Sequence, residues 1–362
     1  MKRFFTLLIA CTALSFSAKA QNIKFVDATE LGIHGHTKQT DKSPYYRFDH
    51  TPYEGFNETI IDHAKKCVGL YITFKTNSSQ IAVTWENAPA STLDNMTGIL
   101  QLGLDLYIKS EGEWKFASVG RVYRVENPDR RTRTLIENLP KGENEFILYL
   151  PIWCEMREVL IGVDKDAYIE GTPSPFRHKV IVHGSSLTHG ASASRAGLTY
   201  PAILSRNLGI DFVNFGFSGE CKMQPQFLEF LKSCEADAFI FDAFSNPSTK
   251  VIKERLEGFV AELVKAHPGK ALIFLQGPTI YGYRFNTIKE AKRQVKKETV
   301  EQMMKALEKQ YKDVYFLNVE NVLGVDGTID NAHPTDLGFH RFVEAYQPKI
   351  AKILKKYDIK GN

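Results

Sequence analysis

Four short segments in the second half of the chain hold residues that can perform nucleophilic chemistry. They contain serine, glycine, asparagine, aspartate and histidine, and they span residues 184–190, 214–219, 245–247 and 330–338. A serine hydroxyl becomes an effective nucleophile when a neutral imidazole accepts its proton. A carboxylate on the other ring nitrogen then fixes the imidazole tautomer. Because all three groups occur in these segments, the sequence predicts a serine-based reaction.

The same segments supply donors for a negatively charged intermediate. Asp330 and His333 are three residues apart, close enough for the carboxylate to contact the imidazole. An oxyanion needs donors that are in place before it forms, and the Ser186 and Gly219 backbone N–H groups and the Asn246 amide can provide them. Each segment alone is more often an ordinary turn, so the prediction depends on their joint occurrence.

The elements around these segments follow an α/β pattern. Short apolar runs at residues 179–183, 212–215, 238–244, 271–276 and 314–319 alternate with helical stretches at 200–208, 227–234, 250–267, 287–311 and 335–357. This alternation predicts a parallel five-stranded sheet covered by helices on both faces. Reactive groups in such sheets collect at the carboxyl ends of the strands, where the first three segments lie, and the fourth segment is a loop before the last helix.

The first half of the chain has a different periodicity. Strand-like runs occur near residues 68–74, 80–85, 102–108, 114–122, 132–136, 146–150 and 158–163, with turn residues between them. Many short strands without crossover helices predict an all-β sandwich of the jelly-roll type. The stretch 170–175, rich in Gly, Pro and Ser, then predicts a linker. We therefore expect one domain over residues 22–172 and a second over 176–362.

Length and charge exclude several classes of protein. A chain of 362 residues is long enough for two domains at about 150 residues each. The formal net charge is only +4, and Lys2, Arg3 and Lys19 supply three of these charges. A nearly neutral remainder gives no indication of nucleic-acid binding. His34 and His36 are the only alternating histidine pair, and without nearby ligands they predict a surface turn, so no metal or other cofactor is expected.

The first twenty residues resemble a secretory signal. Lys2 and Arg3 precede an apolar stretch, and Ala18-Lys19-Ala20 matches a cleavage site. We therefore expect export to the periplasm or the extracellular space, with residues 1–20 removed. The stretch is too short to span a membrane. An alternative is a lipobox ending at Cys11, which would tether the protein by a lipid, although it leaves only about seven apolar residues before the cut.

Taken together, the four segments resemble the sequence blocks of the SGNH, or GDSL-type, serine hydrolases. The resemblance runs from about Lys179 to Lys355, and residues 330–338 match most specifically. It implies a flavodoxin-like α/β domain, with Ser186 as nucleophile, His333 as base and Asp330 as the residue that orients the base. It also implies an oxyanion hole formed by the Ser186 amide, Gly219 and Asn246. The β-rich half is similar to the jelly-roll domain that precedes the hydrolase domain in some exported bacterial members.

Two positions depart from the family pattern. Ser185 stands where the family usually has an aspartate, so a charge that braces the nucleophile loop is expected to be missing. Asn246 is followed by Pro247 instead of the usual aspartate. Because every transferred catalytic and oxyanion group is nevertheless present, an active enzyme is predicted.

Other residues have less specific interpretations. His189, Tyr281, Tyr283 and Arg284 are candidates for lining the substrate pocket, and packing is an equal alternative for the residue 277–285 loop. The basic stretch 289–297 has alternating charge signs, which is typical of a solvated helix face. Among the cysteines, Cys67 and Cys154 are the only plausible disulfide pair, and two buried free thiols are the favoured interpretation.

These observations predict an exported serine esterase that removes acetyl or similar small acyl groups, with an acylated small molecule or glycan as its substrate. The prediction that the substrate is a carbohydrate rests on the architecture and the family resemblance. Two alternatives stay open. One is a glycan-binding protein whose hydrolase half is inactive, and the other is a lipase or thioesterase of the same fold.

Overall fold

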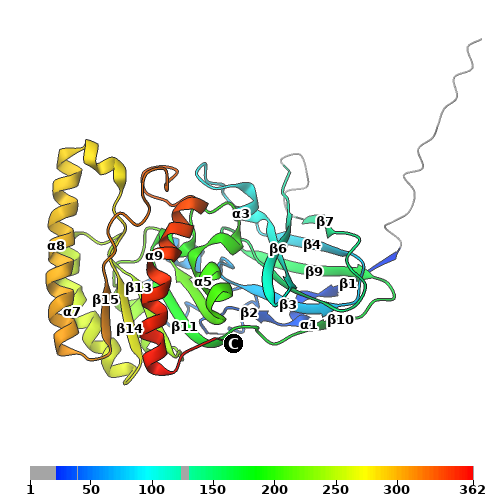
Figure 1. Ribbon diagram of the computed structural model, residues 1–362, viewed down its shortest axis with the longest axis horizontal. Coiled ribbons are helices and arrows are strands. Elements are labelled where there is room, and N and C mark those ends of the chain that lie inside the picture. Colours follow the sequence, from blue (N-terminus) through cyan, green and yellow to red (C-terminus); the bar gives the residue numbers. More distant parts are fainter. Residues whose placement is uncertain (1–21, 39, 124–129, 362) are drawn as a thin grey trace, which may run out of the picture.

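The computed structural model describes residues 22–38, 40–123 and 130–361, and it places an antiparallel β-rich half beside an α/β half (Figure 1). The signal segment and Cys11 lie outside the described residues. None of the helices in the described ranges is long and apolar enough to cross a membrane. Cys67, Cys154, Cys221 and Cys234 are buried free thiols.

The first half is a β-sandwich, as predicted. One sheet has the order β1-β9-β4-β7 and the other β10-β3-β8-β5-β6, with β2 added beside β3. The strands are β1 (Ile23–Asp27), β2 (Ile33–His34), β3 (Tyr71–Thr76), β4 (Ile81–Asn87), β5 (Leu104–Ser110), β6 (Glu113–Gly120), β7 (Arg130–Ile136), β8 (Asn144–Tyr149), β9 (Met156–Asp164) and β10 (Ile169–Gly171). Alternating apolar residues of both sheets, such as Val83, Trp85 and Phe146, fill the space between them.

The second half contains the predicted parallel sheet, with the order β12-β11-β13-β14-β15. Its strands are β11 (Arg177–Gly184), β12 (Ile210–Gly216), β13 (Ala238–Asp242), β14 (Ala271–Leu275) and β15 (Val314–Leu317). Its helices are α4 (Ser186–His189), α5 (Tyr200–Leu208), α6 (Pro225–Lys232), α7 (Thr249–Ala266), α8 (Thr287–Gln310) and α9 (Asp336–Leu354). Short 3₁₀ segments are η2 (Ala196–Leu198), η3 (Tyr281–Phe285) and η4 (Lys355–Tyr357).

Successive residues of the parallel strands face opposite sides of the sheet. Val180 and Val182 of β11 belong to an apolar cluster with α5 and α9, whereas Ile181 belongs to a second cluster with α6, α7 and α8. Burial on both faces explains why these strands are nearly continuous apolar runs. The sheet is therefore rigid at its centre, and its carboxyl ends present the loops that carry the candidate site (Figure 1).

The β-rich half also contains three short helices that its sequence pattern did not predict. They are α1 (Ala28–Leu31), α2 (Glu58–Lys65) and α3 (Gly98–Leu102). The Asn57 side chain caps α2 by accepting from the Ile60 N–H. Ile60 and Ala64 of α2 then pack into the apolar cluster of the second half. The helix depends on that distant surface, which explains why local strand patterns conceal it. The predicted linker is partly ordered, since its first residues pair with β3 as β10.

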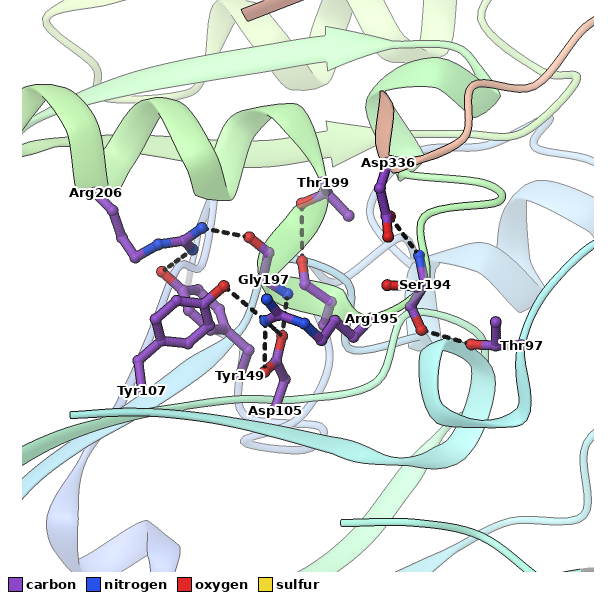
Figure 2. A network of polar contacts seen from close by, with 11 residues as sticks. Thr97, Asp105, Tyr107, Tyr149, Ser194, Arg195, Gly197, Thr199, Arg206 and Asp336 are labelled. Carbon is purple, nitrogen blue, oxygen red and sulfur yellow. Dashed lines mark hydrogen bonds and ion pairs between the residues drawn. The ribbon is translucent and has the colours of Figure 1, made fainter. Parts of the chain in front are cut away.

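A buried polar network joins the two halves (Figure 2). Asp105 of β5 is 1% exposed and accepts from Arg195 Nη1 at 2.9 and 2.8 Å and from the Gly197 N–H at 2.8 Å. Arg195 Nη1 also donates to the Tyr107 hydroxyl at 2.7 Å. A strand of the sandwich thus holds the loop that follows α4.

We predict that Asp105→Ala destabilises the protein far more than loss of an exposed ion pair on the same sheet. The Arg195 guanidinium is mostly buried, and removing Asp105 leaves it without a carboxylate partner, which costs about 3–5 kcal/mol. The matched control is Glu145→Ala, which removes a pair with Lys109 whose side chains are 40% and 42% exposed, and its cost is at most about 1 kcal/mol. Urea unfolding measures both, and equal losses would contradict the structural role of Asp105.

Candidate active site

The candidate nucleophile lies in a tight turn after β11. Ser185 caps α4, with its hydroxyl accepting from the Leu187 N–H, and Ser186 is the first residue of the helix. Gly184 permits the turn, because a Cβ at this position would lie 1.9 Å from Thr188 Oγ1. Ser185 is buried, whereas Ser186 is partly exposed. The turn therefore presents Ser186 at the carboxyl edge of the sheet.

A buried carboxylate from the neighbouring strand holds this turn. Asp242 ends β13, is 0% exposed, and accepts from the Ser185 N–H at 3.1 Å and from the Ser185 hydroxyl at 2.5 Å. Burial raises the pKa of Asp242 above its ordinary value, and the hydrogen bonds from Ser185, Ser245 and Thr188 oppose that rise. The aspartate that the family usually has at position 185 is absent, and Asp242 supplies a carboxyl group that Ser185 contacts directly.

His333 and Asp330 meet as predicted from their spacing. His333 Nδ1 lies 2.7 Å from Asp330 Oδ2, and the His333 backbone N–H donates to Asp330 Oδ1 at 2.8 Å. This contact leaves Nε2 as the free ring nitrogen. Asp330 is partly buried, which alone would raise its pKa, but the hydrogen bonds from His333 and Asn95 hold that pKa well below its ordinary value. Asp330 therefore stays ionised beside the imidazole.

Asn95 reaches this pair from the β-rich half. Its Nδ2 donates to Asp330 Oδ2 at 3.0 Å and lies 3.3 Å from His333 Nδ1. Nearby, the Thr97 hydroxyl donates to the Ser194 carbonyl, and the Ser194 N–H donates to Asp336 at the start of α9 (Figure 2). The first half thus contacts the loop that carries the candidate base directly through Asn95, and it is linked to the start of α9 through Ser194.

The three predicted oxyanion donors come from three strand ends. The Asn246 Oδ1 accepts from the Cys221 N–H at 3.2 Å, which fixes the amide and leaves its NH₂ group free to donate. Gly219 lies two residues before Cys221, in a turn with a φ of 74°. The Ser186 N–H belongs to the first turn of α4, where backbone donors have no partner within the helix. The hydrogen bond to Cys221 links the Asn246 loop to the Gly219 loop.

A cavity of about 790 Å³ borders three of the predicted site residues, and Gly219 is not among its lining residues. Ser186, Asn246 and His333 lie on its wall, and Asp330 stands behind His333. Residues of α8 and of the loop after β14 also line the cavity. A cavity of this volume can hold a small-molecule ligand. The arrangement places a hydroxyl, an imidazole and an amide donor around one space, which suits the attack of serine on an acyl carbonyl.

The four residues predicted to line the pocket occupy different positions. Tyr283 lines the cavity, whereas Tyr281 and Arg284 pair with each other, the guanidinium lying 4.6 Å from the ring centre. His189 does not reach the cavity wall. It is fully buried, its Nε2 contacts the Ile152 carbonyl at 3.0 Å, and its ring lies 5.0 Å from that of Trp153. His189 is therefore a packing residue between the two halves.

Comparisons with known proteins agree with this geometry. Residues 177–351 match the GDSL-like lipase/acylhydrolase family, and residues 23–169 match the N-terminus of SGNH-hydrolase-type esterases. A crystal structure from Bacteroides ovatus ATCC 8483, of a protein assigned to the GDSL-like lipases, is 38% identical over 92% of this chain and 98% of its own, with a TM-score of 0.87. The chain belongs to the GDSL-like lipase/acylhydrolase family. It is an ester-bond hydrolase.

More distant structures share the fold of this hydrolase. The salicylyl-acyltransferase SsfX3 from a tetracycline biosynthetic pathway is 19% identical over 93% of this chain and 98% of its own, with a TM-score of 0.70. A family two carbohydrate esterase from Clostridium thermocellum is 13% identical over 79% of this chain and 92% of its own, with a TM-score of 0.59. The search of curated proteins found no match.

Sequence reasoning missed two features of the hydrolase. Residues 103–107 read Gly-Leu-Asp-Leu-Tyr, the Gly-x-Asp-Leu-Tyr signature of the N-terminal family model, and they supply Asp105 and Tyr107 of the network in Figure 2. Asn95 carried no local signal. Across the described ranges, no group of three or more His, Cys, Asp or Glu residues is placed to hold a metal ion, and His34 and His36 each contact a backbone carbonyl.

We predict that Asn95→Ala raises the pKa of Asp330. The substitution removes one hydrogen bond to the ionised carboxylate, and losing such a bond disfavours the charged form. A carbon-detected NMR titration of the Asp330 carboxyl group measures the shift. Asn207→Ala is the control, because the Asn207 amide donates to Gln347 on α9, away from the cavity wall. An Asp330 titration that is the same in all three proteins would contradict the contact with Asn95.

Proposed function

We propose that this hydrolase is an exported serine esterase that removes acetyl or similar small acyl groups, acting on a carbohydrate through a Ser-His-Asp triad. The observation that carries the catalytic part is the shared cavity of Ser186, Asn246 and His333, with His333 Nδ1 2.7 Å from Asp330. Export is proposed from the signal-like residues 1–20, with lipidation at Cys11 as the alternative. The exported enzyme would then act in the periplasm or outside the cell.

The reaction follows from the positions of these groups. Ser186 Oγ attacks the acyl carbonyl while His333 Nε2 takes its proton, and Asp330 stabilises the imidazolium. The Ser186 N–H, the Gly219 N–H and the Asn246 NH₂ donate to the oxyanion. Collapse of this intermediate breaks the ester C–O bond, and His333 returns the proton to the leaving alcohol. Water then attacks the acyl-enzyme by the same steps in the second half-reaction.

The cavity and the domain architecture support the proposed substrate class. The cavity volume of about 790 Å³ exceeds what an acetyl group fills, so it has room for a sugar unit beside the acyl group. The sandwich half and the signal-like segment are also consistent with an enzyme that meets glycans outside the cytoplasm. The carbohydrate step is therefore an inference from architecture and family resemblance.

We expect Ser186→Ala to reduce hydrolysis of an aryl acetate by at least about 1,000-fold, because loss of the nucleophile removes the acyl-enzyme route. Ser192→Ala is the matched control. It removes a buried hydroxyl of the same loop that has no hydrogen-bond partner among the described residues, so its activity should equal that of the wild type. Release of the phenol is measured by absorbance.

Three experimental results would contradict the proposed function or favour one of its alternatives. Equal turnover by Ser186→Ala and wild type would overturn Ser186 as nucleophile. Absence of hydrolysis with every acylated sugar and aryl ester, together with glycan binding by the intact protein, would favour the inactive glycan-binding alternative. Faster turnover of long-chain esters than of acetylated sugars would favour a lipase or thioesterase.

Hydrolysis should also fall on acidification. The base must be neutral to accept the serine proton, so kcat/KM should decline as the pH is lowered from about 8 to about 5, the range in which an imidazole base ordinarily gains a proton. Asp330 stays ionised through this interval because its pKa is held below the ordinary value. A kcat/KM profile that stays flat over this range, with the fold intact by circular dichroism, would contradict the role of His333.

A further inference from the structure

The part of the cavity wall that α8 forms is basic. Lys289, Lys292, Arg293, Lys296 and Lys297 of α8 all line it. They follow the spacing i, i+3, i+4, i+7 and i+8, which places them on one helix face. No Asp or Glu lies on the cavity wall among the described residues. Lys289 and Lys292 of this face are exposed, as the alternating charges predicted, and the same face also borders the candidate active site.

Two of these cations already have partners. Arg293 contacts Glu290 at 2.7 and 2.8 Å, and Lys297 contacts Glu301 at 3.2 Å and Glu320 at 2.5 Å. Lys289 lies near the Tyr283 ring, 5.4 Å from its centre. In the ranges that the structure describes, no ion pair forms at Lys289, Lys292 or Lys296. The unneutralised charge of the wall is therefore carried by these three lysines.

Lys296 differs from the other two in its burial and its position. Its Nζ donates to the Ser245 carbonyl at 3.0 Å, directly before the candidate oxyanion residue Asn246. Burial lowers the pKa of Lys296 to about 8, and the charge of Asp242 opposes that decrease. An ammonium group has three donors. The Ser245 carbonyl uses one of them, which leaves two for a ligand in the cavity.

We propose that Lys296 binds a carboxylate of the substrate, so that the enzyme prefers acyl esters that carry a negative charge close to the ester bond. The inference rests on the proposed esterase function and narrows its substrate class. A carboxylate would use the free donors of the ammonium and neutralise its charge, and Lys292 at the adjacent turn would add to the attraction. An acidic sugar bearing an acyl group has this chemistry, and so does a dicarboxylic hemi-ester.

A purely structural lysine makes a different prediction. If Lys296 only tethers the Ser245 loop, its loss disturbs Asn246 and slows neutral and anionic esters by the same factor. If it also binds a carboxylate, the anionic ester loses more. The ratio of the two kcat/KM values therefore separates the two roles, whatever happens to either value alone.

The test compares three esters in the full-length protein. 4-Nitrophenyl acetate is neutral, 4-acetoxybenzoate carries the carboxylate on the alcohol side, and 4-nitrophenyl hydrogen succinate carries it on the acyl side. For Lys296→Met we expect the anionic-to-neutral ratio of kcat/KM to fall at least tenfold for one of the two anionic esters, which identifies the side that the carboxylate occupies. Lys296→Arg should restore part of the ratio, because the positive charge remains.

The matched control is Lys305→Met, which removes the same charge from an exposed position of α8 outside the cavity wall. It should leave both ratios unchanged. Ratios that stay the same in Lys296→Met would overturn this inference, while Ser186-dependent hydrolysis of the neutral ester would still support the proposed function.

A binding measurement keeps the inference testable without turnover. Calorimetry with 4-acetamidobenzoate and N-(4-nitrophenyl)succinamate, the unreactive amide counterparts of the two anionic esters, should show at least tenfold weaker binding of one of them to Lys296→Met than to the wild type. Added salt should weaken wild-type binding, since the contact is ionic. Equal affinities in both proteins, or binding that does not respond to salt, would overturn the carboxylate site even if the esterase proposal fails for other reasons.

Discussion

The buried carboxyl group of Asp242 organises the candidate active site. It accepts the Ser185 N–H and hydroxyl on one side and the Ser245 hydroxyl, at 2.9 Å, on the other. Burying such a group costs free energy unless hydrogen bonds satisfy it, and these neighbours provide them. Because Ser186 follows Ser185 and Asn246 follows Ser245, a single group sets the positions of the candidate nucleophile and of an oxyanion donor.

The β-rich half also holds residues of the candidate active site in position. Asp105 holds the loop after α4 through Arg195 and Gly197, and Asn95 contacts Asp330 behind the candidate base. Apolar residues of α2 and of the sandwich continue into the two clusters that cover the parallel sheet. The second half would therefore expose apolar surface and lose polar contacts at its site if it stood alone. This dependence explains why the first half matters to catalysis although it supplies no candidate nucleophile or base.

Local patterns predicted most of the fold because they reflect local physics. The helix expected at residues 200–208 is α5 (Tyr200–Leu208), ended by Gly209 in the left-handed conformation. The strand-end rule predicted the positions of Ser186 and Asn246, and the loop before the last expected helix supplied His333. What the sequence could not reveal depends on residues far apart in the chain. The sequence around Asp242 resembles an ordinary strand end, and Asn95 lies 235 residues before Asp330. The basic face of α8 is a pocket wall only because the fold brings it to the same cavity as Ser186.

The central claim is that Ser186 is a nucleophile activated by His333. Treatment with a fluorophosphonate followed by peptide mass spectrometry tests it most directly, because this reagent traps a serine only when a base activates it. The account predicts one adduct, on the peptide that contains Ser186. The same adduct should be absent from the His333→Gln variant, which keeps Asp242 and the wild-type fold. An unlabelled wild-type protein, or an adduct on a different serine, would contradict it.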